Sequence, residues 1–181
     1  MRGVSMLAVV AAALAGVLAT TTAASTTTHR SAQANIVQVA VASPQLTTLV
    51  SLVKQAGLVS ALSSPKAHLT VFAPTNAAFA KLKKAAPMTF NAIATTPALL
   101  KKILTYHVLP SEVDAMAATA AAKKGASVKT LEGEKIKLSV VGGKLTLNGS
   151  STVIKADIAA SNGVVHLINT VLVPPSVKVT G

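Results

Sequence analysis

One stretch of the chain, residues 69–79, reads LTVFAPTNAAF and combines three local signals. Its first four residues are apolar or β-branched, which predicts a short buried strand. Pro74 has no backbone N–H, so the strand is expected to end there. Thr75 is a good N-cap for a helix that carries Ala78 and Phe79, although the Glu or Gln that completes a capping box is absent at position 78. The stretch therefore predicts a strand that leads directly into a helix.

Helix signals lie on both sides of this stretch. Ser43-Pro44 and Thr96-Pro97 each place a capping residue before a proline, an arrangement that is favoured at a helix start. Gly57 is a natural end for the first helix, and a further short turn of helix is expected over residues 58–62. The apolar residues at helical spacing are Leu46, Leu49, Val50 and Val53 in the first helix and Leu99, Leu100, Ile103 and Leu104 in the second.

From residue 128 onward, apolar residues recur at every second position, which predicts strands. Gly142-Gly143 predicts a two-residue hairpin turn that places Leu138 opposite Leu147. Further strands are expected over 153–158 and 164–173, with Asn162-Gly163 as the turn between them. The Ala-rich residues 115–126 predict either a marginal helix or a loop. Helices followed by a hairpin-rich sheet indicate the α+β class rather than alternating β-α-β units.

Composition bounds what the chain is able to do. Its 181 residues suffice for one domain, and 51% of them are hydrophobic but only 2% aromatic, so the core must be aliphatic. The absence of cysteine excludes disulfides, thiol catalysis and cysteine-based metal sites. The sequence contains no nucleophile elbow, phosphate loop or zinc-protease motif, and its histidines do not have metal-ligand spacing. The sequence therefore predicts no enzyme activity, no cofactor and no metal site.

Residues 1–34 have the pattern of a signal peptide followed by a Thr/Ser-rich leader. Arg2 precedes the apolar run 6–19, and small residues suited to cleavage end at Ala24 and at Ala34. The run is shorter than the roughly 20 residues of a membrane span. Export to the extracellular space, a cell wall or a periplasm is therefore expected, with no membrane span after cleavage, and a retained N-terminal anchor is the alternative.

The charge of the chain is strongly positive, with 17 basic and 5 acidic residues and a net charge of +12. Cleavage after Ala34 removes Arg2 and Arg30, so all remaining basic residues are lysines. Nucleic-acid readers favour arginine forks and stacking aromatics, so a nucleic-acid partner is not expected. The lysines predict either an ordinary solvated surface or a salt-sensitive attraction to acidic polysaccharide or another anionic surface.

Three segments resemble, in the same order, the signatures of fasciclin (FAS1) domains. Residues 69–79 resemble the first box, Tyr106-His107 resembles the Tyr-His pair of the family, and Asp157-Ile158 with NGVVHLIN at 162–169 resembles the second box. The resemblance implies one FAS1 domain over residues 35–175, with a short tail at 176–181. It also implies the FAS1 fold, a wedge-shaped β-sandwich or sheet with several helices packed on one side.

The resemblance also implies candidate binding residues. In adhesion members of the family the Tyr-His pair is implicated in receptor binding, so Tyr106 and His107 are candidates, and the alternative is a purely structural pair that packs and hydrogen-bonds inside the domain. Asp157 and Ile158 resemble a second receptor motif, although their flanks depart from it. The alternative for them is a strand end with an exposed carboxylate.

Two further polar residues have a specific interpretation. Asn148 begins the sequence Asn-Gly-Ser, which is a glycosylation sequon in a eukaryotic protein and otherwise an ordinary turn. His166 lies in an apolar strand and is expected to be a core histidine that is hydrogen-bonded to the backbone.

Three functional hypotheses remain open at this point. The first is a secreted, non-catalytic adhesion or extracellular-matrix protein that recognises cell-surface protein or acidic polysaccharide. The second is a binder of an apolar small molecule such as a carotenoid, since some secreted algal fasciclin proteins carry carotenoids. The third is a hydrolase that acts on wall polymers. The sequence identifies neither the receptor nor the oligomeric state.

Overall fold

The computed structural model describes residues 34–178. The chain divides into two units, Met1–Ser31 and Ala32–Gly181, and all described residues belong to the second. The predicted signal peptide, the leader and the cleavage position at Ala24 lie outside the described residues. Within 34–178, no single helix has the length and hydropathy to span a membrane. One pair of helices, Ile36–Ala42 and Pro44–Gln55, passes the same test by length and composition, but the pair is bent by 102°.

Helices dominate the first part of the described chain and strands the second. The helices are α1 (Ile36–Ala42), the 3₁₀ helix η1 (Pro44–Leu46), α2 (Thr47–Gln55), α3 (Val59–Ser63), α4 (Asn76–Ala85), α5 (Pro87–Thr95), α6 (Pro97–Tyr106) and α7 (Ala115–Lys123). The strands are β1 (Leu69–Pro74), β2 (Val108–Leu109), β3 (Ser127–Lys129), β4 (Lys135–Val141), β5 (Lys144–Leu147), β6 (Ser151–Ala160) and β7 (Gly163–Ile168). The order confirms the predicted α+β class.

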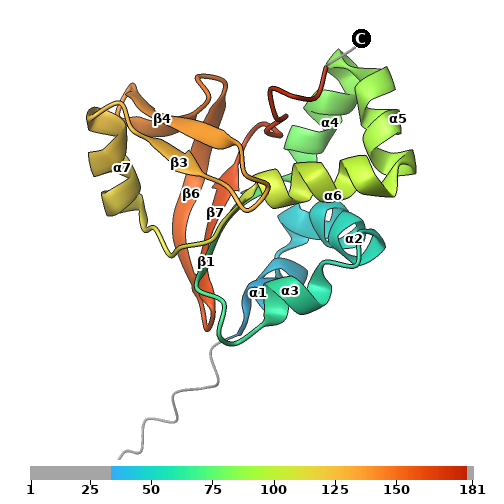
Figure 1. Cartoon of the computed structure of the whole chain (residues 1–181), viewed down its shortest axis with the longest axis horizontal. Helices are drawn as coiled ribbons and strands as arrows, with labels where there is room; N and C mark the ends of the chain where they lie inside the picture. The colour runs from blue at the N-terminus through green and yellow to red at the C-terminus, as the bar shows by residue number, and fades with distance from the viewer. Residues whose placement is uncertain (1–33, 179–181) are drawn as a thin grey trace, which may run out of the picture. The chain divides into compact units, whose positions relative to one another are not determined.

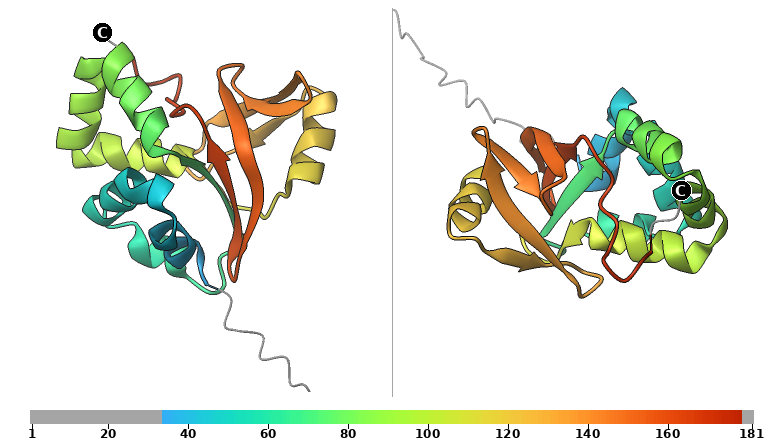
Figure 2. Two further views of the ribbon diagram at one scale, coloured as in Figure 1. Left: turned by 180° about the vertical axis from the view of Figure 1, so that it is seen from behind. Right: turned by 90° about the horizontal axis from the view of Figure 1, so that it is seen from above.

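The strands form one sheet in the order β2-β1-β7-β6-β5-β4-β3. Only β1 and β7 run parallel, with Leu69 opposite Gly163 and Pro74 opposite Ile168. Helices α1–α6 gather on one side, next to β1 and β7, whereas α7 lies at the other end of the sheet, next to β3 and β4 (Figures 1 and 2). The prediction of several helices packed on one side therefore holds for α1–α6, and α7 is the exception.

Two hydrophobic clusters stabilise this arrangement. The first joins α1–α6 to β1 and β7 through aliphatic residues such as Leu46, Leu100 and Val165. The second lies between α7, the β4–β5 hairpin and the opposite face of β1 and β7, and it contains Phe72 and Tyr106. A composition with few aromatic residues is thus sufficient for two mainly aliphatic cores, with Phe79 buried in the first and Phe72 and Tyr106 buried in the second.

The local predictions around β1 are confirmed with one correction. Thr75 caps α4 by accepting a hydrogen bond from the Ala78 N–H at 3.4 Å. The strand, however, extends through Pro74, two residues beyond the four residues 69–72 that predicted it. The Leu69 amide donates to the Asn162 carbonyl just before β7, the Thr75 amide donates to Ile168 of β7, and the Phe72 amide donates to His107 on the opposite side, next to β2. Because successive N–H groups of a strand point to opposite sides, the nitrogen of Pro74 faces the same side as the Phe72 N–H. Strand β2 has already ended on that side, so the proline removes no hydrogen bond of the sheet.

The predicted β4–β5 hairpin is confirmed in register and in turn. Leu138 lies opposite Leu147, and Val141 lies opposite Lys144 across Gly142-Gly143. The second predicted turn is wrong by one residue: Ala160 pairs with Gly163, so the turn is Ser161-Asn162 and Gly163 begins β7. The Ala-rich segment forms α7, whose N-terminus is capped by the Asp114 carboxylate, which accepts from Ala117 N–H at 2.6 Å.

The helix starts are only partly as expected. Ser43-Pro44 opens the 3₁₀ turn η1 instead of the α-helix, and neither Ser43 nor Thr96 caps with its side chain. Gly57 ends α2 as predicted: it has φ +67°, and Leu58 N–H bonds to Val53 C=O in a Schellman motif. Helices α1 and α5 are additional to the predicted elements.

Candidate functional site

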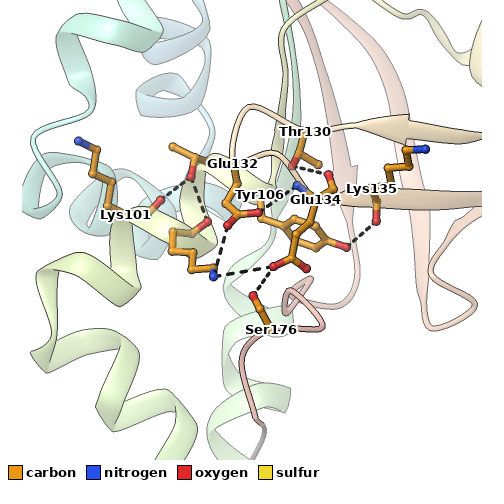
Figure 3. A network of polar contacts seen from close by, with 9 residues as sticks. Lys101, Tyr106, Thr130, Glu132, Glu134, Lys135 and Ser176 are labelled. Atoms are coloured by element: carbon orange, nitrogen blue, oxygen red, sulfur yellow. Dashed lines mark hydrogen bonds and ion pairs between the residues drawn. The ribbon is translucent and has the colours of Figure 1, made fainter.

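Tyr106 lies at the end of α6 with its ring fully buried in the second cluster. Its hydroxyl donates to the Lys135 carbonyl at 3.1 Å (Figure 3). The same oxygen accepts from Asn148 Nδ2 at 2.9 Å. Burial raises the pKa of Tyr106, the Asn148 hydrogen bond opposes that rise, and the Glu134 and Glu132 carboxylates add to it. The Tyr106 side chain therefore holds the last turn of α6 against the β4 and β5 strands.

His107 is also buried, and both of its ring nitrogens are occupied by backbone groups. Nδ1 lies 2.7 Å from the Ile103 carbonyl, and Nε2 accepts the Leu172 N–H at 2.9 Å. Nδ1 must therefore carry the proton of a neutral ring. Burial lowers the pKa of His107 to about 4, partly offset by the hydrogen bond to Ile103. His107 thus joins α6 to the segment that follows β7.

Acid is expected to destabilise the domain through His107. In the unfolded chain His107 titrates near pH 6.5, whereas in the folded domain it titrates near pH 4. Its contribution to stability is therefore complete above pH 6.5 and is lost as the pH falls to 4, by about 3 kcal/mol in total. Urea unfolding at pH 7, 5.5 and 4 of the native chain and of His107→Gln measures this effect. The difference in the free energy of unfolding between the native chain and His107→Gln is expected to shrink toward pH 4. A difference that does not change with pH contradicts the lowered pKa of His107.

Asp157 lies inside β6, where the pairing with β7 is irregular, and not at the strand end that the sequence suggested as an alternative. Its φ of +55° is rare for a residue with a side chain. The exposed carboxylate accepts from the Ala115 N–H at 2.7 Å, at the start of α7. Ile158 is half-buried and packs against the first cluster. Of the candidate pair, Asp157 thus contacts the start of α7, whereas Ile158 packs against the hydrophobic core.

His166 is a buried core histidine, as predicted. Its Nδ1 accepts the Asp157 N–H at 3.2 Å, so its Nε2 carries the proton and donates to the Val113 carbonyl at 2.9 Å. Its ring stacks on Phe72, with 5.6 Å between ring centroids. Since Phe72 N–H also bonds to the His107 carbonyl, this residue of β1 links the two candidate motifs. Sequence reasoning did not find this link, because it depends on the pairing of β1 with β7.

Asn148 occupies a turn between β5 and β6 with φ +50°. Its Oδ1 accepts the Lys137 N–H at 2.9 Å, and its Nδ2 donates to Tyr106. A glycan would be attached at this same nitrogen, so it would have to coexist with the Tyr106 hydrogen bond. Glycosylation at Asn148 stays a prediction.

A polar network joins α6 to the turn before β4 and to the C-terminal segment. Lys102 Nζ lies 3.4 Å from a Glu132 oxygen and 3.8 Å from a Glu134 oxygen, and Ser176 donates to Glu134 (Figure 3). The Glu132 side chain is only 13% exposed. The carboxylate partners of Lys102 lie about thirty residues away in the sequence and meet it only through the fold. Ser176, in the predicted tail, is thus tied to the domain.

The remaining lysines are distributed unevenly. No acidic residue precedes Glu112, so the charged side chains of helices α1–α6 are all lysines. Lys81, Lys83 and Lys84 project from α4 and are exposed, and Lys83 lies 5.9 Å from the centre of the Phe90 ring. We call these three residues the α4 lysine patch. Their uncompensated charge makes this helical layer attractive to anions.

An apolar cavity lies between α1–α3 and β1, and it also touches His107. Its volume is about 30 Å³, which is the space of one water molecule. Groups of three or more His, Asp or Glu side chains that could hold a metal ion do not occur among residues 34–178.

The three signature segments meet in a single domain, and the family model named Fasciclin domain matches residues 44–174. The chain belongs to the fasciclin family. Protein sll1483 of Synechocystis is 44% identical over 140 residues, which cover 77% of this chain and 73% of that protein. Ig-h3 of Sus scrofa is 35% identical over 80% of this chain but only 20% of its own length. Immunogenic protein MPB70 of Mycobacterium bovis is 36% identical over 76% of this chain and 69% of that protein.

A solved structure confirms the fold. The FAS1 domain pair from the insect cell adhesion molecule fasciclin I superposes with a TM-score of 0.70 at 17% identity, and covers 79% of this chain and 52% of the pair. At this identity the likeness establishes the FAS1 fold alone.

Proposed function

We propose that this fasciclin-domain protein is a secreted, non-catalytic adhesion protein that binds an anionic partner at a cell surface or in a matrix. The observation that carries this proposal is the set of exposed lysines on α2 and α4 of a fasciclin domain, none of which forms an ion pair among the described residues. The proposed partner is acidic polysaccharide or an acidic surface protein. Export rests on the pattern of residues 1–34.

The residues that the family resemblance associates with recognition take two different parts in this proposal. Asp157 is exposed and Ile158 half-buried, so they are proposed to contact a partner directly. Tyr106 and His107 are buried, and we propose that they act by holding α6, and hence the lysines next to them, in place. Tyr106→Phe removes the hydrogen bonds of the hydroxyl but keeps the ring. A loss of adhesion in this variant while the domain stays folded supports the positioning role, and unchanged adhesion contradicts it.

Salt is expected to abolish the proposed binding, because the attraction is carried by exposed lysines. The mature domain is immobilised and exposed to its own cell-surface extract in low salt and in about 0.5 M salt. Replacement of Lys81, Lys83 and Lys84 together by Gln is expected to weaken low-salt capture by about tenfold, since three rim charges are lost. The matched control replaces Lys123 and Lys124 on α7 by Gln. Capture that is unchanged in high salt contradicts the proposal.

A second candidate function is the binding of an apolar small molecule such as a carotenoid. The cavity between α1–α3 and β1 has an aliphatic lining that suits such a ligand. At about 30 Å³ it accepts a larger ligand only if the seven-residue helix α1 moves aside. Mixing the purified protein with carotenoid tests this candidate: a shifted pigment absorption band that co-elutes with the protein supports it, and free pigment contradicts it.

A further inference from the structure

Strands β5 and β6 pair through only two positions and then separate. Thr146 lies opposite Thr152 and Leu147 opposite Ser151. Continuation of this register would place Leu145 opposite Val153 and Lys144 opposite Ile154, but neither pair forms. The strand β6 instead continues along β7, with irregular pairing on both sides of Lys155. The sheet is therefore split between β5 and the middle of β6.

The split opens into a groove. A hollow of about 370 Å³ lies there, and it is lined by Lys144 and Leu145 of β5, by Val153 and Ile154 of β6, and by Ala115 and Thr119 of α7. This volume lies within the range of roughly 300–1,000 Å³ that is typical of ligand sites. The residues that line the groove from β5 and β6 include those that the interrupted register leaves unpaired across the β5–β6 edge, although Lys144 and Leu145 pair with β4 and Val153 pairs with β7. We call this hollow the β5–β6 groove.

The side chains that line the groove are mostly apolar or small. Ile154 is 53% exposed, an unusual value for such a large apolar side chain. Lys144 is the charged side chain among the residues that line the groove, so its amine is the group there that can attract a charged partner.

We propose that the β5–β6 groove binds an extended peptide segment of a protein partner by strand addition, with an acidic side chain of the segment directed at Lys144. Strand edges that separate offer backbone N–H and C=O groups to a further strand, and alternate side chains of that strand then enter the apolar groove. The positive charge of Lys144 selects an acidic residue in the segment. This inference rests on the proposed function, because it names the chemistry of the surface partner.

Fluorescence anisotropy with a labelled peptide tests this inference. The probe is a capped peptide of sequence Asp-Val-Thr-Val-Thr, and the matched peptide carries Lys in place of Asp. Thr119→Trp fills the groove from α7, with Ala117→Trp on the exposed face of the same helix as its control. Lys144→Glu reverses the charge, with Lys129→Glu on β3 as its control. Thermal unfolding of each variant establishes that it is folded.

The expected result is saturable binding of the acidic peptide that is about tenfold weaker in Thr119→Trp and in Lys144→Glu, and changes less than twofold in the two controls. Equal binding of the Lys peptide, or unchanged affinity in both groove variants, overturns the proposal. A dimer of this chain that Thr119→Trp disrupts, without peptide binding, also overturns it and assigns the groove to a second copy. If Thr119→Trp does not fold, Lys144→Glu and the two peptides decide the question.

Failure of this inference differs from failure of the proposed function. If the cell-surface extract is captured in a salt-sensitive manner but the peptide is not bound, only the groove proposal fails. If neither binds, the adhesion proposal fails as well.

Discussion

Gly163→Ala is expected to abolish folding of the domain. Gly163 has φ +145°, which a residue with a side chain rarely adopts, and it faces Leu69 in the parallel pair of β1 and β7. A Cβ atom at this position would lie 1.9 Å from the Leu69 carbonyl oxygen, which is backbone and cannot rotate away. The overlap must separate β1 from β7 at the centre of the sheet. We expect a loss of more than about 5 kcal/mol, comparable to the whole stability of an ordinary domain.

Circular dichroism and urea unfolding of the purified variant measure this effect. Gly143→Ala is the control, because Gly143 also has a positive φ of +75° but no atom within 4 Å of the position of its Cβ. Its cost is expected to be only about 1 kcal/mol, which is the conformational term alone. Equal stability of the two variants would mean that close approach of β1 is not what excludes a side chain at 163.

Asn162→Ala is expected to cost about 4 kcal/mol. Asn162 is fully buried, and its side chain makes three hydrogen bonds, to the start of α1 and to the end of α3. Oδ1 accepts the Ile36 N–H at 2.9 Å, and Nδ2 donates to the Leu62 carbonyl at 2.8 Å and to the Ser64 carbonyl at 3.0 Å. Alanine leaves these buried backbone groups without partners, at roughly 1–3 kcal/mol for each group that water does not reach.

Urea denaturation of two further variants separates the causes. Asn162→Asp keeps an acceptor for Ile36 but turns an oxygen toward two carbonyls, so it is expected to be at least as unstable as Asn162→Ala above pH 6. Asn91→Ala, at an exposed position of α5, is the control and is expected to change stability by less than about 0.5 kcal/mol. A cost below about 1 kcal/mol for Asn162→Ala would show that the loss of these hydrogen bonds is compensated by water.

Local patterns explain the parts of the fold that the sequence predicted. The β4–β5 hairpin depends on Gly142-Gly143 and on the alternation of apolar and polar residues within a dozen positions. Its register could therefore be predicted. Helix α1 also had a local signal that was not used: Asn35 and Gln38 form a complete capping box. The parallel pair of β1 and β7 had none, because its partners are distant in the sequence and no turn connects them.

The same distinction applies to the candidate site. The sequence identified Tyr106, His107 and Asp157 as residues of interest, but not what each contacts. The contact of His107 with Leu172 and that of Asp157 with the start of α7 join segments that are brought together only by the central strands. The salt bridges of Lys102 with Glu132 and Glu134 were missed for the same reason. The β5–β6 groove forms because the pairing of β5 with β6 ends after two positions. The alternation of apolar and polar residues in the sequence does not show where such pairing ends.

The position of β7 in the sheet has a consequence for biosynthesis. Although it is the last of the described strands to be translated, it lies between β1 and β6 in the interior of the sheet. Until β7 is synthesised, β1 and β6 lack the strand that pairs with both of them, so cooperative folding of the domain must wait for it. A domain whose interior strand is made after the others stays unfolded while its earlier elements are synthesised.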